Sequence, residues 1–308
     1  MVFFHKLLLG ILYGFVSPFL LMSVVAVPLR FYTRRKLSQP LKLDDWLTLP
    51  SLVGVIALAV LYFYGIGSKA LGYTNPQGGI DHGERITLTR RLNYSSIIIF
   101  AFVNGLIKIS VLSLYGRIFV IVSHWKNHRS LFFRSMMTIV GTWAASFTVA
   151  FIFACGVDPE HMVERCSKGY TVSYWYAISD FISDILIVLV PIPFLWKLQL
   201  PLGRKFAVLG IFLLAIIASA ASLTRVIWTT WDQHFTYADA DEELRITSDN
   251  FWIMVEISFG LLASCLPTLR GLFRKIPKNP SESYALSSRG FASLSDKDSR
   301  RERDRDEE

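Results

Sequence analysis

Five ionisable side chains lie inside apolar stretches of this sequence, where charge is costly and usually has a function. They are Lys108, Asp180, Asp184, Arg225 and Glu256. Asp180 and Asp184 are four residues apart, so a helix would place both carboxyl groups on one face. Asn104 and Lys108 have the same spacing, which predicts a second polar helix face.

The depths of these groups follow from a helical rise of about 1.5 Å per residue. Asp184 falls near the middle of its stretch and Lys108 slightly past the middle, so the two are expected to pair. Asp180, Glu256 and Arg225 fall nearer one end, as a second layer. We expect a polar cavity lined by Asn104, Lys108, Asp180, Asp184, Arg225 and Glu256. The alternative is a set of ion pairs that only fixes helix packing.

The elements that must position these groups are membrane-spanning helices. The chain is 52% hydrophobic and 18% charged, with a mean hydropathy of +0.41, and its charge is concentrated between apolar runs of about 20 residues. Seven spans can be drawn, at about 7–29, 46–66, 94–116, 131–155, 174–196, 206–228 and 250–270. The sequence therefore predicts an all-α bundle of seven transmembrane helices, a multi-pass protein of the plasma membrane or an endomembrane.

The loop charges predict the orientation of the bundle. The first, third and fifth loops and the chain after the last span are basic, whereas the second loop opposes the trend with Arg85, Arg90 and Arg91. The sixth loop is acidic, with Asp232, Asp239, Asp241, Glu242, Glu243 and Asp249 against Arg245. The positive-inside rule then places the N-terminus outside and the C-terminus in the cytoplasm. We expect a short extracellular segment at 1–6, the bundle at 7–275 and a disordered cytoplasmic tail at 276–308.

Several classes of cofactor and partner are not expected. None of the six histidines lies in a predicted span, so the His clusters of a membrane di-iron site or a b-type haem cannot form there. The seventh span contains no lysine for a retinal Schiff base. We therefore predict no metal and no cofactor. The isoelectric point of about 9.4 is explained by the basic inner loops, so nucleic acid is not an expected partner.

The three cysteines fall into two groups. Cys155 and Cys166 lie on the predicted outer side, where a disulfide closing the fourth loop can form. Two free thiols are the alternative. Cys265 lies within the seventh span and is predicted to pack in the core.

Five motifs are spread over most of the chain. They are Asp45-Trp46, KISVLSLYGRIF at 108–119, the pair Cys155 and Cys166, SDILIVLVPIPFLWKLQLP at 183–201, and MVEISFGLLASCLPTLRGLF at 254–273. In this order they resemble the fungal rhodopsin-domain family of integral membrane proteins. The resemblance covers about residues 30 to 290. It points to Asp45, Trp46, Lys108, Tyr115, Arg117, Cys155, Cys166, Asp184, Pro191, Pro193, Lys205, Arg225, Glu256, Pro267 and Arg270.

The resemblance implies a receptor-like bundle. Some family members resemble surface-sensing receptors, and others, including satratoxin-cluster types, are encoded in secondary-metabolite gene clusters. This chain departs from the family at Lys69, where a histidine is common, and has no tryptophan between Cys155 and Cys166. It also lacks the Asp-Arg-Tyr and Asn-Pro-x-x-Tyr motifs, so ordinary G-protein coupling is not assumed.

Two functions remain open at this point. The first is a receptor-like protein in the lipid bilayer that binds a small molecule from outside and meets a cytoplasmic protein partner through its basic loops. The second is a cofactor-independent enzyme or accessory protein of secondary-metabolite biosynthesis. Carboxyl groups removed from water can donate protons, so Asp184 and Glu256 would then be catalytic, in epoxide opening, cyclisation or isomerisation. Whether the chain is an enzyme is not decided by its residues.

Overall fold

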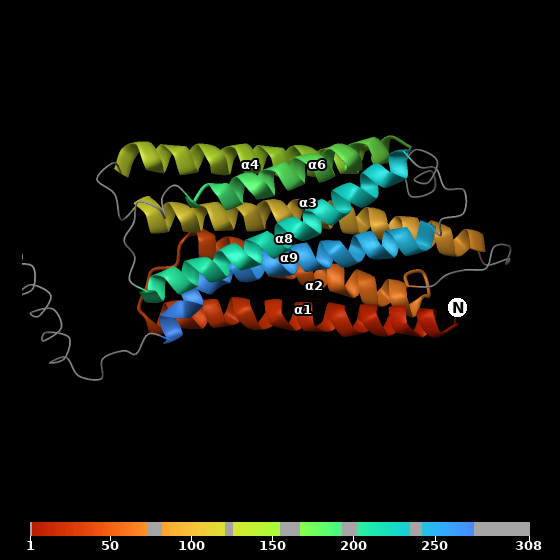
Figure 1. The fold of residues 1–308 in the computed structure, drawn as a ribbon, viewed down its shortest axis with the longest axis horizontal. Helices are drawn as coiled ribbons and strands as arrows, with labels where there is room; N and C mark the ends of the chain where they lie inside the picture. Colours follow the sequence, from red (N-terminus) through yellow and green to blue (C-terminus); the bar gives the residue numbers. More distant parts are fainter. Residues whose placement is uncertain are drawn as a thin grey trace, which may run out of the picture. The chain divides into compact units, whose positions relative to one another are not determined.

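The computed structural model describes residues 2–72, 82–120, 126–154, 167–192, 202–234 and 242–273. In this part of the chain the regular structure is entirely helical (Figure 1). The helices are α1 (Val2–Lys36), α2 (Leu43–Gly67), α3 (His82–Val120), α4 (Lys126–Ala154), α6 (Ser167–Leu189), α8 (Leu202–His234) and α9 (Glu242–Phe273). All 7 are long and apolar enough to cross a membrane. The predicted seven-span, all-α fold of a multi-pass membrane protein is therefore confirmed.

Helices are the required form because hydrocarbon offers no partner to a backbone N–H or C=O group. About 20 residues cross the apolar part of a bilayer. The shortest apolar segments, Thr171–Leu189 and Phe212–Thr230, have 19 residues, and the longest, Glu84–Arg117, has 34. The helices consequently satisfy their own backbones across the membrane, and several continue beyond the apolar segment.

Several helix ends differ from the predicted spans. Helix α1 continues to Lys36 and α2 starts at Leu43, so charges that were assigned to the first loop lie within helices. Basic residues in the last turn of α1 and acidic residues in the first turn of α2 suit the two helix dipoles, which favours this extension. Helix α6 ends at Leu189 rather than near 196, two residues before Pro191, which cannot continue a helix.

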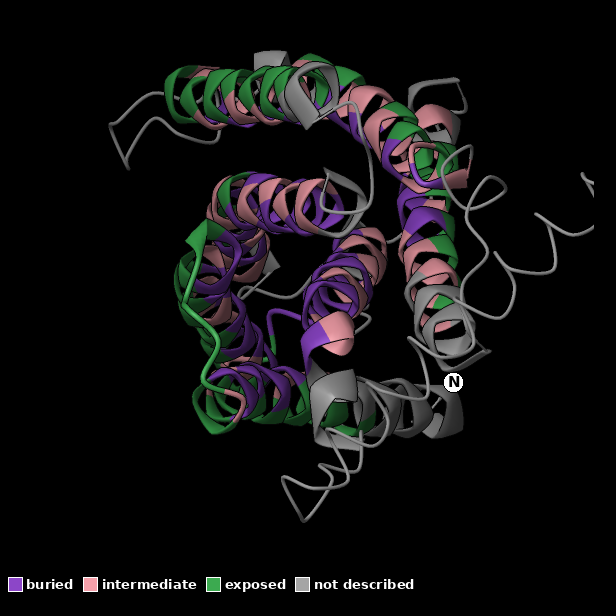
Figure 2. Ribbon diagram, turned by 90° about the vertical axis from the view of Figure 1, so that its left-hand side faces the viewer, coloured by how far each residue is buried: buried purple, intermediate pink, exposed green. Residues whose placement is uncertain are grey.

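Helices α3 and α9 form the interior of the bundle. In each of them 61% of the apolar segment is buried, against 17% in α4 and 22% in α6 and α8. Viewed along the bundle, buried residues turn towards its middle and exposed residues towards its periphery (Figure 2). The core contains buried residues of α1, α2, α3 and α9, among them Val55, Leu58, Phe100, Ile107, Ile253 and Ile257. The exposed apolar faces are those a bilayer would cover.

A close approach between α3 and α4 brings the ring of Trp143 beside Lys108. A Cβ atom at Gly105 of α3 would collide with Ala144 of α4, so only glycine permits this separation. Trp143, the neighbour of Ala144, has its ring centroid 5.1 Å from Lys108 Nζ. The α3–α4 contact thus supplies a cation–π partner for a buried lysine.

Some predictions fall on residues that the structure does not describe. Cys155, Cys166 and the tail from 276 to 308 lie outside the described residues, so the disulfide and the disordered tail stay predictions. Contacts group the chain into Met1–Leu269 and a second unit beginning at Arg270, and the six predicted site residues lie in the first unit. Cys265 is buried, as predicted.

Candidate functional site

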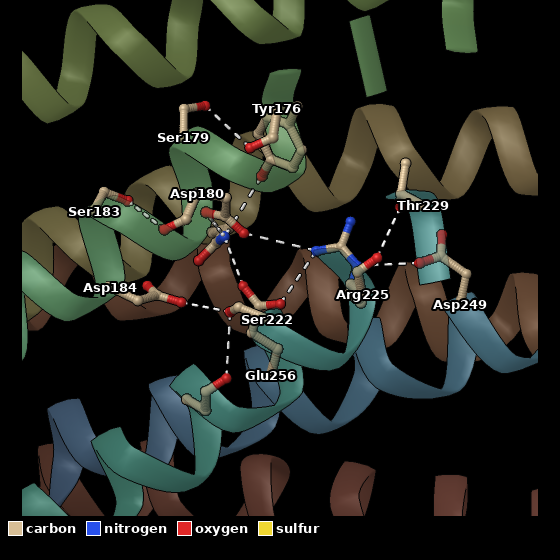
Figure 3. A network of polar contacts seen from close by, with 12 residues as sticks. Tyr176, Ser179, Asp180, Ser183, Asp184, Ser222, Arg225, Thr229, Asp249 and Glu256 are labelled. Atoms are coloured by element: carbon tan, nitrogen blue, oxygen red, sulfur yellow. Dashed lines mark hydrogen bonds and ion pairs between the residues drawn. The ribbon is translucent and has the colours of Figure 1, made fainter. Parts of the chain in front are cut away.

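Four helices bring the six predicted site residues together. We call this set the central cluster: Asn104 and Lys108 on α3, Asp180 and Asp184 on α6, Arg225 on α8, and Glu256 on α9. In Figure 3 the carboxyl groups of Asp180 and Glu256 face each other, with the guanidinium of Arg225 beside them. The spans named from the sequence, the third, fifth, sixth and seventh, are the ones that meet.

Lys108 is held by both aspartates of α6. Its Nζ lies 2.5 Å from Asp180 Oδ1 and 2.8 Å from Asp184 Oδ1. It also donates to the backbone carbonyl of Asp180 at 3.1 Å and to Ser183 Oγ at 2.6 Å. The expected pairing with Asp184 is present, but the expected separation into two layers is not. Aspartates one helical turn apart are both within reach of one flexible lysine side chain.

Arg225 binds three carboxyl groups from two helices. Its Nη1 lies 3.2 Å from Glu256 Oε2 and 3.7 Å from Asp180 Oδ2, and its Nε lies 3.2 Å from Asp249 Oδ1. The guanidinium carbon lies 4.4 Å from the ring centroid of Phe100. Arg225 therefore connects α8 to α6 and α9, and the ring of Phe100 covers one face of its guanidinium group.

Asn104 bridges two carboxyl groups that would otherwise repel each other. Its Nδ2 donates to Asp180 Oδ1 at 2.8 Å and to Glu256 Oε1 at 3.0 Å. The amide can serve both because its NH₂ group carries two hydrogens. Asp180 and Glu256 are thus held side by side in the interior of the bundle.

Acidic groups outnumber basic groups in this region. Two cations, Lys108 and Arg225, face the carboxyl groups of Asp180, Asp184, Asp249 and Glu256. Asp180 is fully buried, and its Oδ2 accepts no hydrogen bond from the residues that the structure describes. A buried carboxylate oxygen without a donor is rare and costly. The cluster therefore has the chemistry to accept one further cation or hydrogen-bond donor.

The acidic groups are also close enough to share one ion. Carboxylate oxygens of Asp180, Asp184 and Glu256 all lie within 4.8 Å of one another. Lys108 already supplies positive charge to the first two of these residues. The arrangement is therefore an ammonium group held by carboxylates, and an entering cation would compete with Lys108 for them.

An aromatic wall covers the α4–α6 side of the cluster. The ring of Tyr176 stacks on Trp143 at 5.3 Å and contacts Phe100, Phe147 and Phe151 edge to face. The Tyr176 hydroxyl lies 3.5 Å from Asn104 Nδ2. Such a wall lowers the polarity on this side of the cluster, beside Lys108, which strengthens the ion pairs of that lysine.

Several members of the site were missed in the sequence. Asp249 was assigned to the acidic sixth loop, although it precedes Glu256 by two helical turns and so shares its face. Ser222 Oγ donates to Asp184 Oδ2 at 2.5 Å. Spacing could have identified Asp249, but a serine among many in apolar helices gives no such signal.

A second group of charges lies where α1 ends and α2 begins, and we call it the α1–α2 lock. Arg30 Nη2 lies 2.6 Å from Asp44 Oδ2, and Arg30 Nε lies 2.8 Å from Asp45 Oδ1. Arg34 contacts the same two aspartates at 3.3 and 3.1 Å. Arg30 Nη1 also donates to the carbonyl oxygen of Ser264 on α9. Of the lock, only Asp45 was singled out in the sequence, through the family resemblance.

The chain has recognisable relatives. Polyenoic acids biosynthesis gene cluster protein Ba17b of Metarhizium anisopliae is 23% identical over 85% of this chain and 73% of its own length. Receptor GIN3 of Arthrobotrys oligospora is 25% identical over 82% of this chain, which spans 60% of that receptor. A SAT4 family membrane protein of Emericella nidulans is 26% identical over 60% of this chain and 46% of its own length.

The family assignment rests on the match to a whole domain. No solved structure matches the chain. The fungal rhodopsin domain matches residues 29–275, which include six complete helices and the end of α1. The six residues of the central cluster and the charged residues of the α1–α2 lock all lie within that match. The chain therefore belongs to the fungal rhodopsin domain family of multi-pass membrane proteins.

Proposed function

We propose that this protein is a receptor whose central cluster binds a small molecule with a positively charged or hydrogen-bond-donating group. The proposal rests on the excess of acidic over basic groups around Asp180. Its Oδ2 is buried without a hydrogen bond from the described residues, and Arg225 Nη1 is 3.7 Å away. A ligand ammonium would give this oxygen the donor that it lacks.

The path to the cluster runs past Asp249 and Arg225. The side chain of Asp249 is 25% exposed, against 5% for Arg225 and 3% for Glu256, so Asp249 forms the accessible edge. Asp249 lies near the start of α9, on the side that the loop charges predict to be extracellular. The ligand would enter from this side and meet Asp249 before Arg225 and the buried carboxyl groups.

Binding at the cluster can change the arrangement of the helices. A ligand cation at Asp180 and Glu256 would displace Arg225, which keeps its contact with Asp249 at 3.2 Å. Arg225 is on α8, whereas Asp180 and Glu256 are on α6 and α9, so this exchange loosens α8 from its neighbours. A ligand that favours the exchanged pairing shifts the bundle towards that state, which is the minimum that a receptor requires.

The relatives support a receptor without defining its ligand. GIN3 is named a receptor, and it aligns with 82% of this chain. The basic ends of α1 and α4, which the loop charges place in the cytoplasm, offer a surface for a cytoplasmic protein partner.

Binding of organic amines tests this proposal. Full-length protein in detergent should be stabilised by some members of a library of protonatable amines, and not by their neutral isosteres. Ligand at 100 times its Kd adds about 2.7 kcal/mol, which a thermal shift resolves. Asp180→Asn should abolish the shift, whereas Glu84→Gln, at the exposed start of α3, should preserve it. Equal stabilisation by neutral isosteres would rule out an ion-pairing site.

Secondary-metabolite biosynthesis is the second candidate function. Asp184 and Glu256, the two carboxyl groups proposed as proton donors, lie in the same cluster. The relative Ba17b is named for a biosynthesis gene cluster. Deletion of the gene followed by metabolite profiling separates the two functions. Accumulation of a precursor that Asp184→Asn reproduces supports the enzyme, and an unchanged profile supports the receptor.

A further inference from the structure

Arg117 carries a positive charge that the α1–α2 lock does not neutralise. Asp44 Oδ2 already receives Arg30 and Arg34, and Arg117 Nη1 lies 3.8 Å from that oxygen. The same Nη1 atom is buried and donates no hydrogen bond to the described residues. Three guanidinium groups therefore share the two carboxylates of Asp44 and Asp45, and one positive charge remains unbalanced.

The flanking sequence adds positive charge and no acid. Between Arg117 and Val157 the chain contains Lys126, Arg129 and Arg134 but no aspartate or glutamate. The segment 37–42 between α1 and α2 also has none, and after α9 the first acid is Glu282. The segments that connect helices at the end of the bundle where Arg117 lies thus have no acidic group to pair with Arg117. An anion from outside these segments would balance the remaining positive charge.

Exposed apolar side chains lie next to these basic residues. On α4, Leu131 is 67% exposed and Phe132 is 46% exposed, and Arg134 beside them is exposed too. Figure 2 shows α4, the upper helix of Figure 1, with exposed residues along its outer face. Apolar side chains beside arginines at the end of a span match the depth of lipid headgroups and the start of the acyl chains.

Arg117 and Arg134 lie at the same level of neighbouring helices. A Cβ atom built on Gly116 of α3 would be 3.4 Å from Phe133 Cβ of α4. Arg117 directly follows Gly116 on α3, and Arg134 directly follows Phe133 on α4. Gly116 and Phe133 therefore lie at contact distance, and the turns of α3 and α4 that carry the two arginines are adjacent.

We propose that the α3–α4 end of the bundle binds the phosphate group of an anionic phospholipid. The exposed Arg134 donates to the phosphate from the membrane side, and the 18% exposed side chain of Arg117 adds positive charge from the protein side. Guanidinium groups suit phosphate oxygens because their N–H groups form a planar fork. The exposed Leu131 and Phe132 favour a lipid over a soluble anion, since they contact the acyl chains.

Native mass spectrometry of the full-length protein tests the proposal. The protein is released from nanodiscs of phosphatidylcholine with and without phosphatidylserine or a phosphoinositide, and retained anionic lipids are counted. Arg117→Gln and Arg134→Gln should each weaken retention about five-fold, the effect expected for one basic residue near a membrane surface. Arg35→Gln removes an exposed charge from the last turn of α1 and should leave retention unchanged.

Further arms of the experiment distinguish other anions. Inorganic phosphate and the soluble headgroup glycerophosphoserine should compete weakly. Full competition by either would identify a soluble phosphate and overturn the lipid proposal. An equal loss in Arg35→Gln would show diffuse surface attraction and would also overturn it. The lipid proposal would also be overturned if the bundle retained a cytosolic protein and this retention depended on Arg117 but not on lipid. Because Arg134 is exposed, its variant remains informative if Arg117→Gln misfolds.

Discussion

Replacing Lys108 with methionine is expected to destabilise the folded bundle by about 3–5 kcal/mol. The substitution leaves Asp180 and Asp184 buried without the ammonium that now lies 2.5 and 2.8 Å from them. Methionine fills a similar volume, so the loss reports on charge rather than on a cavity. Thermal or denaturant unfolding in detergent micelles measures the change.

The matched controls separate this ion pair from general effects of the mutation. Lys36→Met removes an exposed lysine from the last turn of α1 and should change stability little. Asp184→Asn added to Lys108→Met removes one uncompensated charge and should restore part of the loss. If Lys108→Met alone were as stable as the wild type, the ammonium would not be holding the two aspartates.

Replacing Arg30 with methionine is expected to cost a similar free energy of unfolding, about 3–5 kcal/mol, by opening the α1–α2 lock. Arg30 is fully buried, and its fork reaches Asp44, Asp45 and the carbonyl oxygen of Ser264. These partners lie on α2 and α9, so one side chain fixes α1 to two other helices. The same unfolding assay measures the effect.

Arg30→Lys gives the sharper version of this prediction. A lysine keeps the charge but has one compact ammonium group, which cannot reproduce the planar fork. We expect Arg30→Lys to recover less than half of the loss, and Arg35→Met, at an exposed position in the last turn of α1, to be neutral. Full stability in Arg30→Lys would mean that charge alone, without geometry, secures the lock.

The central cluster could be predicted because its members stand out individually. A charged residue in an apolar run is rare, and a spacing of four fixes the shared face of Asp180 and Asp184. The pairing of Lys108 with Asp184 followed from depth along the helices. The second contact, from Lys108 to Asp180, did not, because it depends on how α3 and α6 approach each other in three dimensions.

The α1–α2 lock could not be predicted in the same way. Hydropathy ends a span at its first charged residues, so Arg30 and Arg34 were placed in a loop rather than in the last turns of α1. Their burial comes from tertiary packing against α2 and α9. Asp249 was missed for the same reason, since it lies inside α9 among residues that are charged enough to look like a loop.

Cysteine accessibility tests whether the central cluster is a site open to ligand or a closed structural lock. Ser183→Cys, in a background without the other cysteines, places a thiol where Ser183 Oγ now lies 2.6 Å from Lys108 Nζ. Ser258→Cys, at a fully buried position of α9, serves as the unreactive control. Positively and negatively charged methanethiosulfonate reagents of similar size are applied to intact cells.

We expect the thiol of Ser183→Cys to react, and the cationic reagent to react faster because acids outnumber bases around it; Asp180→Asn should reduce this preference. If Ser183→Cys is labelled as slowly as Ser258→Cys by both reagents, the cluster is closed and its charges only hold the helices together.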